Sequence, residues 1–386
     1  MNSEADPYLS KQLIRLLLSD HNHEAASDTS ASLFGDLYAM AELSIKHGLG
    51  SLLYSRIKDD DIYKKLNPTL KNALKSQTLT TIASNEKLFA VIPVFHGLQQ
   101  PFVFLKGMAL LPMLYKEASL RPMSDIDIIS KFDSFPLIVN RLKKDGFREM
   151  RIREGKIASE IASSIVEDWK TLRKGSVVID LHSRISFKQK RRFIEGDYFI
   201  QHSMKLRYGK HILPCPEPEL MLLHLLIHLD KHLKEGVARY SNLVDILLFL
   251  KEHKDSMDWG LFKTHCEKTD TFELAAGWLT LLKNEFELHS EIPDYHRIPE
   301  ENIAFTYLEW MQRGSQRKHA MIPPWEREIY GALKTSGQKR KYIFSILFPS
   351  LAYMRSTYGI KSKLLVLLYY PVRIISRIAF YLRRKR

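Results

Sequence analysis

The sequence has little cysteine and no signal-like start. Only Cys215 and Cys266 occur among 386 residues, and neither lies in a CxxC or Cys/His metal-binding spacing. A disulfide framework is therefore not expected, and a reducing compartment is favoured. The start, MNSEADPYLSKQ, lacks a basic stretch followed by an apolar one. We therefore predict no secretory signal and a cytoplasmic location.

Acidic residues are missing from the last part of the chain. The net charge is +14, and residues 329–386 contain thirteen Lys or Arg and no Asp or Glu. The preceding residues hold the other 45 of the 58 basic side chains against 44 acidic ones, so the body is nearly neutral. A body that gripped long nucleic acid would more often carry the charge itself, so that partner is less favoured.

Residues 336–386 alternate apolar runs with basic and aromatic residues, and Pro371 and Arg373 interrupt the most apolar run. No window of about eighteen residues there is free of charge, so a spanning helix is not expected. We interpret this basic tail as an amphipathic segment for peripheral association with the inner face of a membrane or with an acidic partner. A helix packed on the body and docking to RNA are the alternatives.

The hydrophobic pattern predicts an α+β fold with helical regions on both sides of a small mixed sheet. In residues 1–98, apolar residues recur at spacings of three and four, which is typical of helices that bury one face. Residues 99–215 mix helices with short strands. Residues 216–335 are helical again, with one helix apolar nearly all round and therefore buried. Residues 336–386 form the basic tail.

Within residues 99–215, apolar and alternating runs indicate the order of the elements. Strands are expected at residues 102–105, 125–129, 147–153 and 177–183, helices at 108–115 and 134–144, and a hairpin at 205–213.

Three carboxylates are the strongest candidates for chemistry. Asp125 and Asp127 are two apart in a strand-like segment, so both point to one side, roughly 6.5 to 7 Å apart along the strand. Asp180 ends another apolar run, where an ionised side chain is costly without a partner or a role. Two divalent cations about 3.5 to 4 Å apart suit such a set.

Lys106-Gly107 and Arg121 strengthen this interpretation. Lys106-Gly107 lies at a predicted strand-to-helix junction, where a cation and free helix amides favour phosphate oxygens. Arg121 shortly precedes the carboxylates, and its forked donors also suit phosphate. Alternatively, the first is an ordinary turn and the second a structural ion pair with Asp125. Together with the aspartates they describe a site for magnesium and a triphosphate.

The segments FLKGMALLPMLY, LRPMSDIDIIS and VVIDLHSRI, in this order, resemble the uncharacterised nucleotidyltransferase family of the polymerase-beta-like superfamily. The flanking segments AELSIKHGLGSLLYSRI, LPCPEPELMLLHLLIHLDKH and RYSNLVDILLFL resemble it too, so the likeness spans roughly residues 40–250. Most superfamily members carry Gly-Ser or Gly-Gly about ten residues before the Asp pair, whereas here Lys106-Gly107 lies farther ahead.

The resemblance implies a small polymerase-beta-like sheet and a nucleoside triphosphate substrate. Asp125 and Asp127 would bind two Mg²⁺ ions, with Mn²⁺ as a substitute, and Asp180 would bind the catalytic one and help deprotonate the acceptor. Lys106, Gly107 and Arg121 would hold the triphosphate. The hydroxyl of an unidentified acceptor (a small molecule, sugar, peptide or protein) would attack the α-phosphate and displace pyrophosphate.

Supporting roles are assigned to five further residues. His182 is expected on the face of its strand opposite Asp180. His224, His228 and His232 recur every four residues and share one helix face. We interpret these three as polar residues that line the interface between the core and this helix, rather than as zinc ligands, and assign His228 and His232 a supporting role. Lys231 and Arg239 lie nearby in the sequence.

Three other functions remain open. A non-catalytic nucleotide-binding regulator, docked by its basic tail, would bind without turnover. Nucleotide-dependent transfer of phosphate or sugar would release a different product. A zinc hydrolase based on the helical histidines is the most distant alternative.

Overall fold

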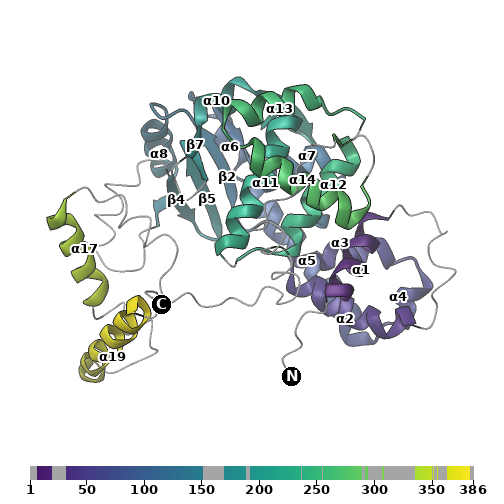
Figure 1. Ribbon diagram of the computed structural model, residues 1–386, viewed down its shortest axis with the longest axis horizontal. Coiled ribbons are helices and arrows are strands. Elements are labelled where there is room, and N and C mark those ends of the chain that lie inside the picture. Colours follow the sequence, from purple (N-terminus) through teal and green to yellow (C-terminus); the bar gives the residue numbers. More distant parts are fainter. Residues whose placement is uncertain are drawn as a thin grey trace. The chain divides into compact units, whose positions relative to one another are not determined.

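The computed structural model describes residues 7–19, 32–150, 169–187, 192–235, 237–253, 255–288, 292–293, 335–349 and 363–382, together with Tyr307, Leu351 and Met354 (Figure 1). The chain divides into two compact units. The first comprises residues 1–147 and 173–316, and the second comprises residues 148–172 and 317–386.

The first unit begins with helices, as the apolar spacing predicted. Asn67 caps the long helix among them, because its side chain accepts a hydrogen bond from Leu70 N (2.8 Å) and Pro68 follows at the first helical position. Gly48 has a φ of 74° and separates two helices within residues 32–57. The helices are α1 (Pro7–Leu18), α2 (Ser32–Lys46), α3 (Gly50–Ile57), α4 (Asp61–Lys65), α5 (Pro68–Phe89) and α6 (Ile92–His96).

A five-stranded mixed sheet follows and confirms the predicted α+β class. Its order is β1-β2-β5-β4-β3, with β1 antiparallel and β5 parallel to the fully buried β2. The strands are β1 (Phe102–Phe104), β2 (Ile126–Ser130), β3 (Arg148–Glu149), β4 (Trp169–Lys174) and β5 (Val177–His182). β3 lies within the strand expected at residues 147–153, of which residues 151–153 lie outside the described residues. β4 was not predicted from the sequence.

Helices and short elements connect the strands of the sheet to one another and to the helices that follow. The predicted helices are α7 (Lys106–Leu114) and α8 (Phe135–Lys144), and the predicted hairpin is β8 (Ser203–Tyr208) with β9 (His211–Pro216). Unpredicted elements are the antiparallel pair β6 (Arg184–Phe187) and β7 (Arg192–Glu195), the short helix α10 (Gly196–Gln201) and the turn η2 (Ala118–Leu120).

Four helices complete the described part of this unit: α11 (Pro218–Glu235), α12 (Tyr240–His253), α13 (Trp259–Lys268) and α14 (Phe272–Phe286). α11 packs against the other three, and its residues 220–223 are fully buried, as its apolar sequence predicted. α12 also packs against α7, so the C-terminal helices support the start of the sheet region.

The second unit includes β3 and the first residues of β4, and it also contains α17 (Ser336–Leu347) and α19 (Lys363–Leu382), which pack together. Arg373 Nε donates to the carbonyl oxygen of Ile346 (2.8 Å), and the Tyr370 hydroxyl donates to that of Pro349 (2.5 Å). α19 continues through Pro371 and Arg373, the residues that interrupt its apolar run. Within the described residues, every helix is too short or too polar to cross a membrane.

Candidate functional site

The three aspartates predicted from sequence lie at one face of the sheet. The parallel register of β2 and β5 pairs Asp127 with Asp180, and paired residues of neighbouring strands point the same way about 4.8 Å apart. Asp125 directly precedes β2 and has the same alternation as Asp127. The fold thus gathers carboxylates from two strands that are distant in sequence.

Lys106 holds the central carboxylate. Its Nζ donates to Asp127 Oδ1 (2.7 Å), and the backbone N of the preceding Leu105 donates to Asp127 O (2.9 Å). Lys106 begins α7 with a φ of 44°, a left-handed conformation that costs about 1 kcal/mol or more for a side-chain-bearing residue. Burial alone lowers the pKa of Lys106, but Asp127 raises it above the ordinary value, so the ammonium stays charged.

The carboxylates differ in their electrostatic environment. Although burial by itself raises the pKa of Asp127, Lys106 and His182 hold it well below its ordinary value. By contrast, burial and the Asp127 charge raise the pKa of Asp125, with Asp180 adding to this repulsion. A divalent cation between these groups would relieve the repulsion, so this oxygen-rich set fits Mg²⁺.

His182 faces the site, and the expectation that it points away is wrong. It lies two positions after Asp180, so strand alternation places both side chains on the same face. Its Nε2 is 3.4 Å from Asp127 Oδ1. His182 is thus a neighbour of the central carboxylate.

Arg121 pairs with Asp245 of α12 rather than with Asp125. Its Nη2 donates to Asp245 Oδ2 (2.7 Å) and its Nε contacts both carboxylate oxygens (3.1 and 3.2 Å). The Tyr115 hydroxyl also donates to Asp245 Oδ1 (2.6 Å). Burial by itself lowers the pKa of Arg121, but Asp245 raises it above its ordinary value. The guanidinium is therefore fixed and charged.

The third guanidinium nitrogen lies against the start of α7. A Cβ atom at Gly107 would come within 2.8 Å of Arg121 Nη1 and of Met123 Sδ. A larger residue would force Arg121 or Met123 to shift, so glycine allows this close approach, which brings the predicted Lys106, Gly107 and Arg121 together. The structure therefore places two cations beside the first turn of a helix, an arrangement that attracts phosphate.

The histidines of α11 extend from this site. Both ring nitrogens of His224, which is 1% exposed, have no hydrogen-bond partner within the described structure. Burial and then Lys106 lower the pKa of His224 to about 3 and of His232 to about 4, and they lower that of His228 well below its ordinary value. The ring centroids of His228 and His232 are 3.8 Å apart. At neutral pH this row is uncharged and lies near Lys106.

The remaining predicted residues, Lys231 and Arg239, are exposed. Lys231 is exposed, and its charge contributes to the lowered pKa of all three α11 histidines. Arg239 is exposed, and its backbone N donates to Asn242 Oδ1 (2.9 Å). Its charge acts on His47, whose pKa burial, Lys46 and Arg239 together lower to about 4.

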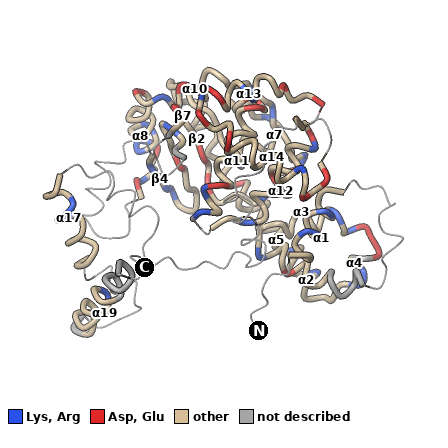
Figure 2. The backbone as a smooth tube through the Cα atoms, viewed as in Figure 1, with Lys and Arg blue, Asp and Glu red and all other residues tan. Residues whose placement is uncertain are grey.

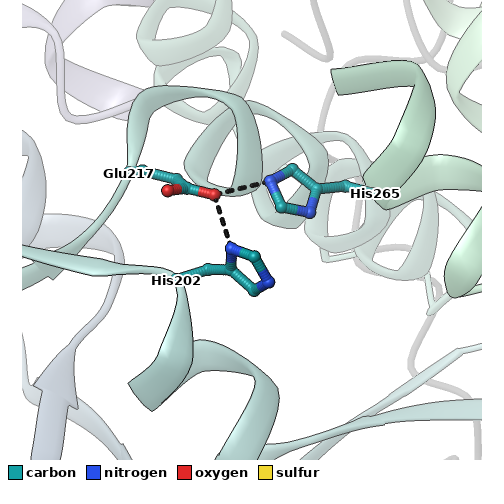
Figure 3. A group of neighbouring side chains, drawn as sticks. All are labelled: His202, Glu217 and His265. Atoms are coloured by element: carbon teal, nitrogen blue, oxygen red, sulfur yellow. Dashed lines mark hydrogen bonds and ion pairs between the residues drawn. The ribbon is translucent and has the colours of Figure 1, made fainter. Parts of the chain in front are cut away.

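A second cluster was not predicted. Within the described residues, only His202, Glu217 and His265 bring three metal-ligating atoms within 4.8 Å of one another (Figure 3). The histidines and the glutamate are far apart in sequence, so no local spacing signals this cluster.

Residues 36–287, which include the sheet, the aspartates and α11, match the family described as uncharacterised nucleotidyltransferase. No curated protein matches the chain. The match covers well over half of the chain and contains Lys106, Arg121 and all three aspartates. The chain therefore belongs to this family of uncharacterised nucleotidyltransferases.

Proposed function

We propose that the protein transfers a nucleoside monophosphate from a nucleoside triphosphate to an acceptor hydroxyl and releases pyrophosphate. The observation that carries the proposal is the pairing of Asp127 with Asp180 across β2 and β5, with Asp125 on the same face and Lys106 beside them. Carboxylates facing cations at a helix start are what a metal–triphosphate site requires.

Asp125, Asp127 and Asp180 are the residues that would hold Mg²⁺, with Mn²⁺ as a substitute. Bound there, the metal would supply charge neutralisation of the triphosphate and activation of the attacking hydroxyl. The Lys106 ammonium now sits 2.7 Å from an Asp127 oxygen, which is the kind of place a metal cation prefers. Because Lys106 has a long side chain, it can turn from Asp127 to a phosphate oxygen once the carboxylate has another cation.

The start of α7 is suited to the phosphates. Gly107 lets Arg121 approach the backbone closely, and the first amides of α7 add partial positive charge. Arg121, fixed through Asp245, adds a charged nitrogen at the same place. Asp180, less buried than Asp127, would accept the proton of the attacking hydroxyl.

The neutral histidines line the remaining side. His228 and His232 can donate or accept hydrogen bonds to the nucleotide or acceptor without adding charge. His182 holds Asp127 in place. Small molecules, sugars, peptides and proteins all carry suitable acceptor hydroxyls.

Calorimetric titration with each nucleoside triphosphate tests whether the site binds its substrate. We expect binding that requires Mg²⁺ or Mn²⁺ and weakens by about tenfold or more in Asp127→Asn, since a ligand oxygen is lost. Asp59→Asn, an exposed aspartate of the first unit, is the matched control and binds like wild type. Binding that needs no metal, or that survives Asp127→Asn, would contradict the proposal.

A further inference from the structure

The cluster of His202, Glu217 and His265 has the features of a second metal site. His202 Nδ1 and His265 Nε2 lie 2.9 and 2.7 Å from the same carboxylate oxygen, Glu217 Oε1 (Figure 3). Two imidazole nitrogens and a carboxylate oxygen are ligands that Zn²⁺ prefers.

The surrounding structure fixes these side chains. His265 is fully buried in α13, and its second nitrogen, Nδ1, is 2.7 Å from the Tyr198 hydroxyl. A zinc-bound histidine commonly engages a polar group through its other nitrogen, which fixes the ring orientation. Glu217 N donates to His202 O (3.0 Å), so these two ligands are also tied through the backbone.

The cluster is also accessible and separate from the aspartates. His202 and Glu217 are partly exposed, so an ion can enter from solvent. His202 directly follows α10, Glu217 directly precedes α11, and His265 lies in the last turn of α13. A bound ion would thus hold together elements that position the histidine row of α11.

We propose that His202 Nδ1, Glu217 Oε1 and His265 Nε2 bind a zinc ion, with water at the fourth position. When the ion binds, the proton that each imidazole now directs toward Glu217 moves to the other ring nitrogen, Nε2 of His202 and Nδ1 of His265. His265 Nδ1 then carries its proton and donates to the Tyr198 oxygen. The site stabilises the fold and takes no part in nucleotidyl transfer.

Zinc binding to the full chain, measured by competition with a chromophoric chelator, tests this site. Wild type should bind about one zinc ion per chain, and Co²⁺ should give the visible absorption of a tetrahedral site. Glu217→Gln retains a hydrogen-bond acceptor and should remain folded, but it should bind zinc at least about tenfold more weakly. His96→Ala, an exposed histidine, should bind like wild type.

Two results would overturn the zinc site: no zinc binding by folded wild type, or wild-type affinity in Glu217→Gln. Neither result depends on the aspartates. Failure of the zinc site is therefore distinguishable from failure of the proposed transfer activity.

An independent observation concerns α17 and α19. Leu365, Leu368, Val372 and Ile375 recur at spacings of three and four along one face of α19 and are 54, 68, 53 and 67% exposed. By contrast, Val366 and Arg373 of α19 are buried, and Arg373 donates to the carbonyl oxygen of Ile346 in α17. α19 therefore presents an aliphatic stripe to its surroundings.

The exposed residues at and after the middle of α17 interleave cations with apolar side chains. Arg340 and Lys341 are exposed beside Ile343, Phe344 and Phe348, which are 40, 61 and 45% exposed. The described parts of both helices carry Lys and Arg and no acidic residue (Figure 2). These residues and the α19 stripe together form what we call the α17–α19 surface.

We infer that the α17–α19 surface binds an anionic lipid membrane as an interfacial helix pair. Basic residues match anionic headgroups, and aliphatic and aromatic side chains enter the boundary between headgroups and acyl chains. Nucleic acid matches the charge but offers no place for the Leu, Val and Ile stripe.

Sedimentation of the full chain with vesicles tests the membrane surface. We expect binding to phosphatidylcholine mixed with phosphatidylglycerol, and at least about tenfold weaker binding to phosphatidylcholine alone. Leu368→Glu/Ile375→Glu and Arg340→Glu/Lys341→Glu should each abolish binding. Leu137→Glu, an equally exposed leucine on α8, should not.

Equal binding to both kinds of vesicle, or binding to neither, would overturn the membrane assignment. So would self-association, or RNA binding, that disappears in the same two double variants, because a second copy or RNA would then be the partner.

Discussion

The buried group of Arg121, Asp245 and Tyr115 ties the loop before β2 to α12. Removing the Asp245 carboxylate should therefore lower the free energy of unfolding. Asp245 is 2% exposed and accepts hydrogen bonds from both Arg121 and Tyr115. In Asp245→Ala the guanidinium and the hydroxyl both remain buried without this partner.

The size of the effect follows from these contacts. Breaking a buried ion pair by removing one partner costs about 3 to 5 kcal/mol. The unsatisfied Tyr115 hydroxyl adds about 1 to 2 kcal/mol. Tyr115→Phe should cost less, about 1.5 to 3 kcal/mol, because it removes one hydrogen bond to a charged group. In Asp245→Leu/Arg121→Met most of the loss should be recovered, since no buried charge is left unpaired.

Urea denaturation followed by far-UV circular dichroism measures these free energies of unfolding. Asp61→Ala, which breaks the exposed pair between Asp61 and Lys64, is the control and should show no measurable change. A cost below about 1 kcal/mol for Asp245→Ala would refute the reasoning, because the pair would then be too weak to fix Arg121.

Three further predictions concern the site and its surroundings. Gly107→Ala should weaken nucleotide binding by about tenfold in calorimetry, because its Cβ forces Arg121 and Met123 to move, and wild-type affinity would contradict this. Lys106→Met should lower the free energy of unfolding in urea by about 3 kcal/mol, because Asp127 loses the ammonium that pairs with it. Mg²⁺ should raise the melting temperature of this variant more than that of wild type, and an equal rise would count against the metal site. The free energy of unfolding should fall as the pH drops from about 6.5 to 4, because a histidine in the unfolded chain binds a proton near pH 6.5, whereas buried His47 becomes protonated only at about pH 4. For His47 the loss amounts to about 3 kcal/mol at pH 4. Urea titrations at several pH values measure it, and His47→Gln should show a weaker pH dependence.

Local patterns were sufficient to predict much of the fold and the aspartates. Apolar residues at spacings of three and four mark the helices in the sequence. The alternation of side chains along β2 places Asp125 and Asp127 on one face, independently of the rest of the chain. The same rule, correctly applied to β5, would have placed His182 beside Asp180. That error lay in the application of the rule, because the residues themselves carried the signal.

Long-range partners could not be predicted from spacing. Asp245 is 124 residues from Arg121, and nothing near either residue marks the pair. The cluster of His202, Glu217 and His265 likewise exists only because α10, α11 and α13 pack together. β4 was missed because its polar, mostly exposed sequence, WKTLRK, lacks the apolar alternation by which strands are recognised.

The central claim is that the acceptor attacks the α-phosphate and receives a nucleoside monophosphate. The position of the label that is transferred tests this claim most directly. The protein would be incubated with Mg²⁺, a cell extract as acceptor source, and each nucleoside triphosphate labelled at either the α- or the γ-phosphate. We predict transfer of α-label alone with release of pyrophosphate, absent in Asp125→Asn/Asp127→Asn and retained in Asp59→Asn. Transfer of γ-label would indicate a phosphotransferase, and tight metal-dependent binding without transfer of either label would indicate a regulatory nucleotide binder; either result would contradict the account.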